Sequence, residues 1–192
     1  MAGSAAYTAI LDACVLYPAT LRNVLLSLAH AGLYHARWTE AIEDEWMRNL
    51  LRNRPDLTAQ QLRQVQARMN EAIADCRVTH YEPLISGLTL PDAKDRHVLA
   101  AAIAGHADAI VTLNLRDFPA DTLSRYNLEA QHPDEFVMNQ LELREYEALT
   151  AIKRMRARLG NPTLGAEEFV DMLERQGLVQ TALHLRRRIE LI

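Results

Sequence analysis

The 192-residue sequence has few of the residues that build a disulfide framework or a zinc site, and it has no long apolar run. Cys14 and Cys76 are its cysteines, and neither lies near another cysteine or histidine at ligand spacing, so we expect buried, reduced thiols. The histidines form no H-x-x-x-H or H-E-x-x-H pattern. Apolar stretches such as VLLSLAHAGL are far shorter than the roughly 20 residues of a membrane-spanning helix, and no signal-peptide pattern opens the chain. These absences predict a cytoplasmic protein without a membrane span, whose metal ligands, if it has any, are oxygens.

Lysine is also scarce, and the charges are distributed unevenly along the chain. Only 2 of the 21 basic residues, Lys94 and Lys153, are lysines. The net charge is -4, yet residues 151–192 carry 8 basic and 5 acidic side chains. The basic segments KRMRAR (153–158) and RRR (186–188) are candidates for phosphate contact, and a solvated helical face is the alternative. With 49% hydrophobic and 24% charged residues, the composition is that of an ordinary globular domain.

Strand and helix patterns alternate over the first two thirds of the sequence. TAILDA and AIVTL are short apolar runs typical of buried strands, and RVTHY is a third candidate strand. Between them, helix patterns run from Pro18 to Gly32, from a Thr39 cap, from a Thr58–Gln61 capping box, and from Asp92 to Gly105. This alternation predicts an α/β fold with a doubly wound parallel sheet flanked by helices.

The strand pattern ends near Pro133. Three helices are expected beyond it, at 133–142, 144–159 and 163–188, the last beginning near Thr163 or Gly165 and broken at Gly177. We therefore expect two domains, an α/β domain over 1–132 and an all-helical C-terminal extension over 133–192.

Four acidic residues follow a strand or begin a helix in this pattern, namely Asp12, Glu45, Asp95 and Asp117. Parallel sheets bind ligands outside the carboxyl ends of their strands, so these carboxylates should meet at one edge. Carboxylate oxygens are hard ligands that select Mg²⁺ or Mn²⁺ over zinc. The pattern predicts a divalent-metal site.

Each acid also has a simpler structural explanation. Asp12 could form an Asx turn or cap the next helix, and Asp92 is favoured as a helix cap. Within the acidic run before Trp46, Glu45 lies at the edge of the apolar stripe, where a carboxylate can be held firmly and still reach a cleft. Glu43 falls further inside the apolar arc and is the second candidate for the helix ligand.

The joint order of these motifs resembles the PIN domain, in particular the PIN endonucleases of the VapC-type toxins of bacterial toxin-antitoxin systems. The resemblance covers about residues 7–132 and is carried by ILDA, WTEAIEDEW, D-x-x-D-R-H-V-L-A-A-A and IVTLNLRDFP. The helical tail is similar to the C-terminal extension of one branch of these proteins.

The resemblance implies a role for each matching position. Asp12, Glu45 and Asp95 correspond to the metal-binding acids, and Thr112 would orient a carboxylate or a metal-bound water. The residue two positions after that threonine is usually Asp in the family and is Asn114 here, so Asp117 would take its place. Arg96 and Arg116, which adjoin proposed ligands, are candidates to steady the scissile phosphate.

The activity that the resemblance implies is Mg²⁺- or Mn²⁺-dependent cleavage of single-stranded or loop RNA by the toxin of a type II toxin-antitoxin pair. It also implies an antitoxin protein that lies across the active-site cleft, and a homodimer. The arginine-rich region from Arg37 to Arg68 and the basic tail are candidate surfaces for RNA or antitoxin. The alternative function, which Asn114 favours, is a non-catalytic PIN-like module that binds protein or RNA.

Overall fold

Four short strands form one parallel sheet in the computed structural model of this chain, which describes residues 7–160 and 164–192. The strands lie in the order β2-β1-β3-β4. Their bounds are Thr8–Leu11 for β1, His35–Arg37 for β2, Ala109–Val111 for β3 and Glu129–Gln131 for β4. Because the first strand lies inside the sheet and neighbouring strands are joined through helices, the predicted doubly wound α/β class is confirmed.

The sheet is stabilised by burial of the apolar segments from which its two central strands were predicted. Ile10 and Leu11 of β1 are fully buried, as are Ile110 and Val111 of β3, and Ile10 pairs with Ile110 in register. Burying each such side chain contributes about 1.5–3 kcal/mol, so these two strands can anchor the core although they are short. Helix α6 (Arg96–Ala104) packs against both of them. These contacts fix where the carboxyl ends of β1 and β3 lie.

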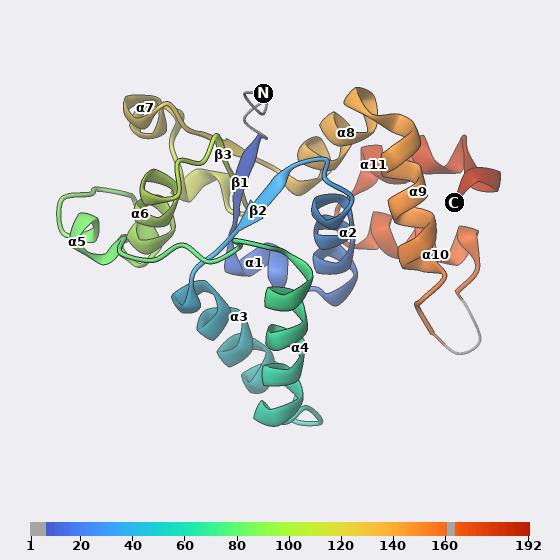
Figure 1. The fold of residues 1–192 in the computed structure, drawn as a ribbon, viewed down its shortest axis with the longest axis horizontal. Coiled ribbons are helices and arrows are strands. Elements are labelled where there is room, and N and C mark those ends of the chain that lie inside the picture. Colours follow the sequence, from blue (N-terminus) through green and yellow to red (C-terminus); the bar gives the residue numbers. More distant parts are fainter. Residues whose placement is uncertain (1–6, 161–163) are drawn as a thin grey trace. The chain divides into compact units, whose positions relative to one another are not determined.

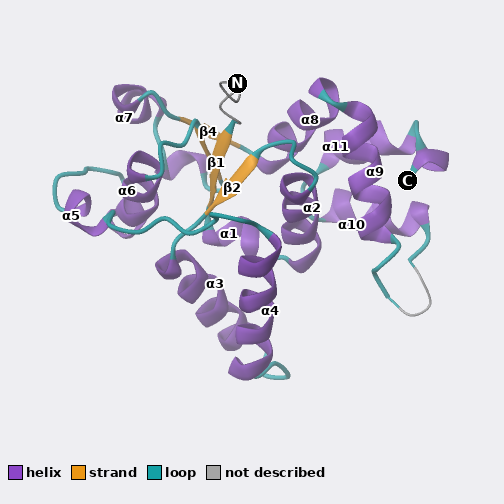
Figure 2. Ribbon diagram, in the orientation of Figure 1, coloured by secondary structure: helices purple, strands orange, loops and turns teal. Residues whose placement is uncertain are grey.

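The other helical segments of residues 7–17 and 34–132 lie around the sheet (Figures 1 and 2). Helix α3 lies beside α4 and is also in contact with α1, and α5 packs against α6. Their bounds are Ala13–Leu16 (α1), Glu40–Asn53 (α3), Ala59–Ala72 (α4), Glu82–Ile85 (α5) and Ala120–Leu123 (α7), with 3₁₀ turns at Ala93–Asp95 (η1), Leu115–Asp117 (η2) and Ser124–Tyr126 (η3).

The predicted helix caps are present. The Thr39 hydroxyl accepts a hydrogen bond from the Ile42 backbone N–H at 3.2 Å, and the reciprocal capping box between Thr58 and Gln61 opens α4. Such caps contribute about 1 kcal/mol each because they satisfy backbone donors that a helix leaves free at its start.

Three details of the sequence prediction were wrong. RVTHY is not a strand, since Arg77 makes only an isolated bridge with Trp38. The short strands β2 and β4 were not predicted, because their sequences, HAR and EAQ, are mostly polar and lack the apolar run that identified β3. The segment from Asp92 to Ala104 is a 3₁₀ turn followed by α6, and not one continuous helix.

The C-terminal segment is helical within the described residues, as expected. It contains α8 (Pro133–Leu143), α9 (Glu145–Arg156), α10 (Ala166–Arg175), α11 (Val179–Arg186) and a 3₁₀ turn, η4 (Ile189–Leu191). The Asp134 carboxylate accepts hydrogen bonds from the backbone N–H groups of Gln180 and Thr181, at 2.8 and 2.9 Å, and so caps α11 from another helix. Gly165 is the N-cap of α10, while Thr163 lies outside the described residues.

The chain divides into two compact units that are not contiguous in sequence. The first comprises Met1–Tyr17 and Tyr34–His132, and the second comprises Pro18–Leu33 and Pro133–Ile192. Helix α2 (Ala19–His30) thus belongs to the helical unit, where its Leu21 N–H donates to the Gln176 side chain at 3.1 Å. The division into functional domains at residue 132 stays a prediction. In the described part of the chain, no helix has the length and apolar character needed to cross a membrane.

Candidate active site

Asp12 stands at the point where β1 ends and α1 begins. Its backbone N–H donates to the Val111 carbonyl at 3.1 Å, which continues the pairing of β1 with β3 by one residue. Its side chain then turns back to cap α1, with Oδ1 accepting from the Ala13 N–H at 2.7 Å. The capping role considered from the sequence is therefore present, and the carboxylate is buried, with 6% exposure. A capped, buried carboxylate has a fixed orientation.

The second oxygen of Asp12 is held by Thr112, which directly follows β3, and by Cys14 in α1. The buried hydroxyl of Thr112 donates to Oδ2 at 2.7 Å, and the Cys14 thiol donates to the same oxygen at 3.1 Å. Burial, and after it the neighbouring Asp12 charge, raise the pKa of the Cys14 thiol to about 12, so the thiol keeps its proton at neutral pH. Burial also raises the pKa of Asp12, against the opposing effect of these hydrogen bonds.

Asp95 is a carboxylate on which the charges of several other acids act. It closes η1 and stands at the start of α6. Burial, followed by the charges of Asp12, Asp92, Asp117 and Glu45, raises the pKa of Asp95 to about 6. Burial alone raises a carboxyl pKa, but the further rise from these four charges requires that they lie close to Asp95, because screening weakens the interaction at longer range. The four acids proposed as ligands therefore interact through one shared electrostatic field.

Glu45 approaches this field from α3. Its side chain is 36% exposed, and Oε2 lies 3.4 Å from His97 Nε2. His97 follows Asp95 by two positions in the first turn of α6, so this contact links the two helices beside the acidic residues. Glu45 is thus anchored at one oxygen and open to solvent.

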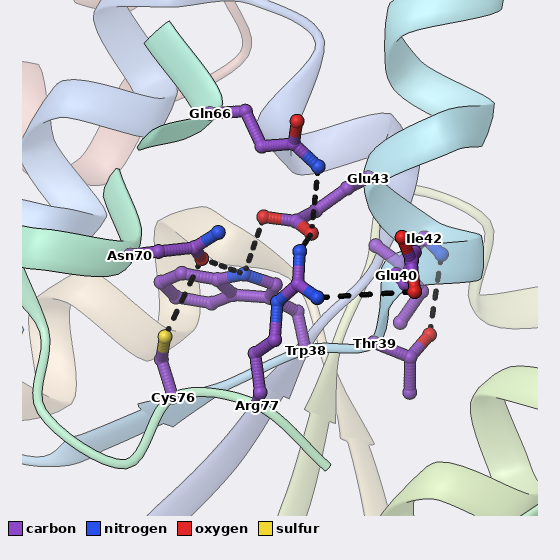
Figure 3. A network of polar contacts seen from close by, with 9 residues as sticks. All are labelled: Trp38, Thr39, Glu40, Ile42, Glu43, Gln66, Asn70, Cys76 and Arg77. Carbon is purple, nitrogen blue, oxygen red and sulfur yellow. Dashed lines mark hydrogen bonds and ion pairs between the residues drawn. The ribbon is translucent and has the colours of Figure 1, made fainter. Parts of the chain in front are cut away.

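Glu43, the second candidate for the helix ligand, lies in a separate polar network (Figure 3). Its side chain is fully buried, and its carboxylate accepts hydrogen bonds from Trp38 Nε1 at 3.1 Å, Gln66 Nε2 at 2.9 Å and the Arg77 guanidinium. Asn70 completes the network by accepting from the same Trp38 N–H at 3.0 Å. The oxygens of Glu43 are therefore occupied in joining α3, α4 and the segment at Arg77.

The other predicted residues have different degrees of contact. Asp92 caps η1, with Oδ1 accepting from the Lys94 N–H at 2.9 Å. Asn114 is exposed, and its backbone N–H donates to the Thr112 hydroxyl at 3.0 Å. Arg116 is exposed on η2, whereas Arg96 is half-buried. Among the described residues, no carboxylate is within ion-pair distance of either arginine.

Sequence reasoning missed the parts played by Cys14, His97 and Arg77. Cys14 is two residues after Asp12, and that spacing within one helical turn was the available signal. His97 is two residues after Asp95, and its Nδ1 atom is buried without a hydrogen-bond partner within the part of the chain described. The contact of Arg77 with Glu43 had no signal, because 34 residues separate them.

The carboxylates proposed as ligands fit a hard divalent cation in chemistry and charge, but their oxygens do not surround one common position. Among residues 7–160 and 164–192, no three His, Cys, Asp or Glu side chains are arranged to hold one ion as they stand. Like-charged carboxylates lower their energy by turning apart, and a cation between them reverses this preference. To bind one ion together, partly exposed side chains such as Glu45 would have to rotate, whereas the hydrogen-bonded Asp12 carboxylate would stay in place.

Comparison with known proteins gives an independent view of the chain. Residues 8–116, more than half of the chain, match the PIN domain family, and residues 133–187 match the VapC50 C-terminal domain. A curated protein of Mycobacterium tuberculosis named "Putative ribonuclease VapC50" is 42% identical over 94 residues, which are 49% of this chain. The match spans only 55% of the length of that relative. No solved structure matches the chain. The chain belongs to the PIN domain family, and its C-terminal helical segment is similar to the VapC50 C-terminal domain.

Proposed function

We propose that the chain is a divalent-metal-dependent endoribonuclease that cleaves single-stranded or loop RNA, and that it acts as the toxin of a type II toxin-antitoxin pair in the cytoplasm. The observation that carries the proposal is the gathering of acids at the edge of β1 and β3, where burial of Asp95 and, after it, the charges of Asp12, Asp92, Asp117 and Glu45 raise the pKa of Asp95 to about 6. Sites with like charges so close are characteristic of catalysis or metal binding, and a structural role would not require them.

The proposed ligands of Mg²⁺ or Mn²⁺ are Asp12, Glu45, Asp95 and Asp117. When bound, a divalent ion supplies an activated water for attack on phosphorus and stabilises the leaving oxygen. The chain's own residues would hold the ligand carboxylates in position and supply negative charge around the ion. Thr112 and the Ala13 N–H hold the Asp12 carboxylate from two sides, at 2.7 Å each. Asp92 adds negative charge from η1.

Asn114, Arg96 and Arg116 are assigned to the substrate. Asn114 is exposed beside Thr112 and offers a neutral amide to a phosphate oxygen. Arg96 and Arg116 would neutralise the scissile phosphate, because guanidinium groups bind phosphate oxygens in a planar, bidentate manner. The proposed partners are an RNA substrate, an antitoxin that covers the acidic residues, and a second copy of the chain.

The test is cleavage of a labelled single-stranded RNA with added Mg²⁺ or Mn²⁺. Asp95→Asn should abolish cleavage and leave the far-ultraviolet circular dichroism spectrum unchanged, since the substitution removes a ligand charge and no packing. Asp121→Asn, an exposed acid on α7, is the matched control and should cleave as the parent chain does. Undiminished cleavage by Asp95→Asn would refute the proposed function.

A non-catalytic PIN-like binding module is the second candidate. Two observations favour it: Asn114 replaces a usual acid, and the described carboxylates do not converge on one point. Calorimetric titration with Mn²⁺ separates the two functions. A nuclease should bind the ion at millimolar concentration or below, and Asp12→Asn should weaken that binding, whereas a non-catalytic module should take up no Mn²⁺.

A further inference from the structure

We propose that the groove formed by α3, α4 and α5 holds the single RNA strand next to the scissile phosphate, through Arg48, Arg52 and Arg63. This inference rests on the proposed nuclease function and assigns the surface that the substrate occupies. The groove has a volume of about 910 Å³ and lies wholly within the unit that contains the sheet. Helices α3 and α4, which contribute much of its lining, lie side by side in Figure 1.

Uncompensated positive charge distinguishes this groove. Arg48, Arg52, Arg63 and Lys94 line it and are all exposed. Within the described residues, no carboxylate lies within ion-pair distance of any of the four. Among their side chains, Arg48 Nε donates a hydrogen bond to the carbonyl oxygen of Asp44 at 3.2 Å. Their charges are therefore free to bind an anion.

Two other arginines of this unit are already paired with carboxylates. Arg54 binds Asp56 at 2.6 Å, and Arg77 binds the buried Glu43. The groove cations also outnumber the acids Asp44 and Glu45 that line the same surface. The imbalance is local, because the chain as a whole has a net charge of -4. A polyanion is thus attracted to the groove while most of the chain repels it.

The spacing of the arginines fits an anion with repeating charge. Arg48 and Arg52 are four residues apart on α3, which places them on the same face with about 5–6 Å between Cβ atoms. Arg63 faces the groove from α4. Cations on both walls can contact successive phosphates of one strand, as in proteins that bind single-stranded nucleic acid.

The lining between the cations is apolar and suits unpaired bases. It is formed by Met47, Leu51, Leu62, Tyr81 and Ile85. Leu62 and Tyr81 are nearly buried and give a firm base to the groove, with 4% and 7% exposure. Proteins recognise unpaired bases through apolar and stacking contacts that a paired helix does not offer. The groove therefore favours single-stranded over double-stranded RNA.

The groove also reaches the acidic residues. Glu45 and His97, which are in contact at 3.4 Å, are part of its lining. A strand lying along Arg52 and Arg48 would therefore be led to Glu45, one of the proposed ligands. An RNA strand needs this continuity, because its scissile phosphate must reach the carboxylates while its neighbouring phosphates stay on the arginines, so the observations favour RNA over an acidic amphipathic peptide.

The test measures binding of a fluorescein-labelled single-stranded RNA of mixed sequence by anisotropy, in EDTA, so that no cleavage occurs. Arg48→Gln, Arg52→Gln and Arg63→Gln should each weaken binding about threefold to tenfold and reduce the slope of log affinity against log salt by about 0.7–1. Arg125→Gln is the matched control, because Arg125 is exposed on η3 and does not line the groove. Its affinity should stay within about twofold of the parent chain, as expected for one distant charge.

Equal losses in Arg125→Gln and in the groove variants would overturn the inference, since they would reflect net charge alone. Unchanged RNA binding in the groove variants would also overturn it, and simultaneous loss of binding to a synthetic acidic amphipathic peptide would then assign the groove to a protein partner. Binding is measured apart from cleavage. A chain that binds RNA through these arginines but cleaves none with Mn²⁺ would refute the proposed function and support the groove assignment.

Discussion

Replacing Glu43 by alanine should destabilise the sheet-containing unit, although Glu43 is only two residues before the proposed ligand Glu45 on the same helix. Glu43 is fully buried and accepts hydrogen bonds from Trp38, Gln66 and Arg77 (Figure 3). Removing one partner of a buried ion pair costs about 3–5 kcal/mol when the other partner is also buried. Here the Arg77 side chain is 40% exposed and can be hydrated after the loss.

The expected cost is therefore about 2–3 kcal/mol, because Trp38 keeps its bond to Asn70 but Gln66 loses its acceptor. Glu40 supplies a matched control on the same helix. Its side chain is 73% exposed and lies 3.8 Å from Arg77. Exposed pairs of this kind contribute at most about 1 kcal/mol, so Glu40→Ala should have a small effect.

The assay is urea unfolding followed by tryptophan fluorescence. The chain has 2 tryptophans, Trp38 and Trp46, and both lie in the unit that contains the network. Glu43→Ala should lower the urea midpoint by about 1 M or more, given typical denaturant slopes. Equal midpoints for Glu43→Ala and Glu40→Ala would refute the structural role of Glu43.

Two glutamine variants decide between the two candidate helix ligands. Glu43→Gln should lower the midpoint and leave Mn²⁺ binding close to that of the parent chain. Glu45→Gln should do the reverse, since the side chain of Glu45 is 36% exposed and forms one contact, with His97. If calorimetry instead finds that Glu43→Gln weakens Mn²⁺ binding more than Glu45→Gln, the ligand assignment must be exchanged.

Two further predictions concern residues near the sheet. Charged Asp95 is disfavoured in the folded chain, because its pKa is about 6 against a usual 3.8, so the resulting destabilisation is absent below about pH 4 and complete above pH 6. In EDTA near neutral pH, Asp95→Asn should raise the melting temperature by about 2–4 °C, roughly 1 kcal/mol after allowance for solvent screening, with no gain below pH 4; a gain at low pH would contradict this. Gly105→Ala should cost about 1–3 kcal/mol in thermal melts, because an added Cβ would lie 2.9 Å from both the Ala101 carbonyl oxygen and Val78 Cγ2. Gly87→Ala, whose nearest contact would be at 3.7 Å, is its control, and equal melting temperatures would argue against the clash.

Much of the fold could be predicted because its signals are local. The apolar runs of β1 and β3 identified the two central strands, and Thr39, Thr58 and Gly105 marked helix ends through caps that depend on a few neighbouring residues. The placement of acids just after strands also followed from the order of elements. Their assignment as metal ligands remains a proposal.

The rest required contacts between distant segments. The strands β2 and β4 are three residues long and gain their extended form by pairing with β1 and β3. Helix α2 lies between two strands in sequence, yet it groups with the C-terminal helices, because α9 and α10 supply the surface it packs against. Local periodicity does not specify which partner an apolar face will meet.

The sequence by itself determined the α/β order, the central strands, the principal helix caps and a short set of acidic candidates. Only the tertiary structure separated Glu43 from Glu45, which differ by two positions on one helix. Helical periodicity places both near the apolar edge, but Arg77 and Gln66, distant in sequence, surround Glu43 and leave Glu45 beside the groove. Burial and hydrogen-bond partners are set by packing across the whole unit, and for that reason the role of each carboxylate was not encoded in its immediate neighbours.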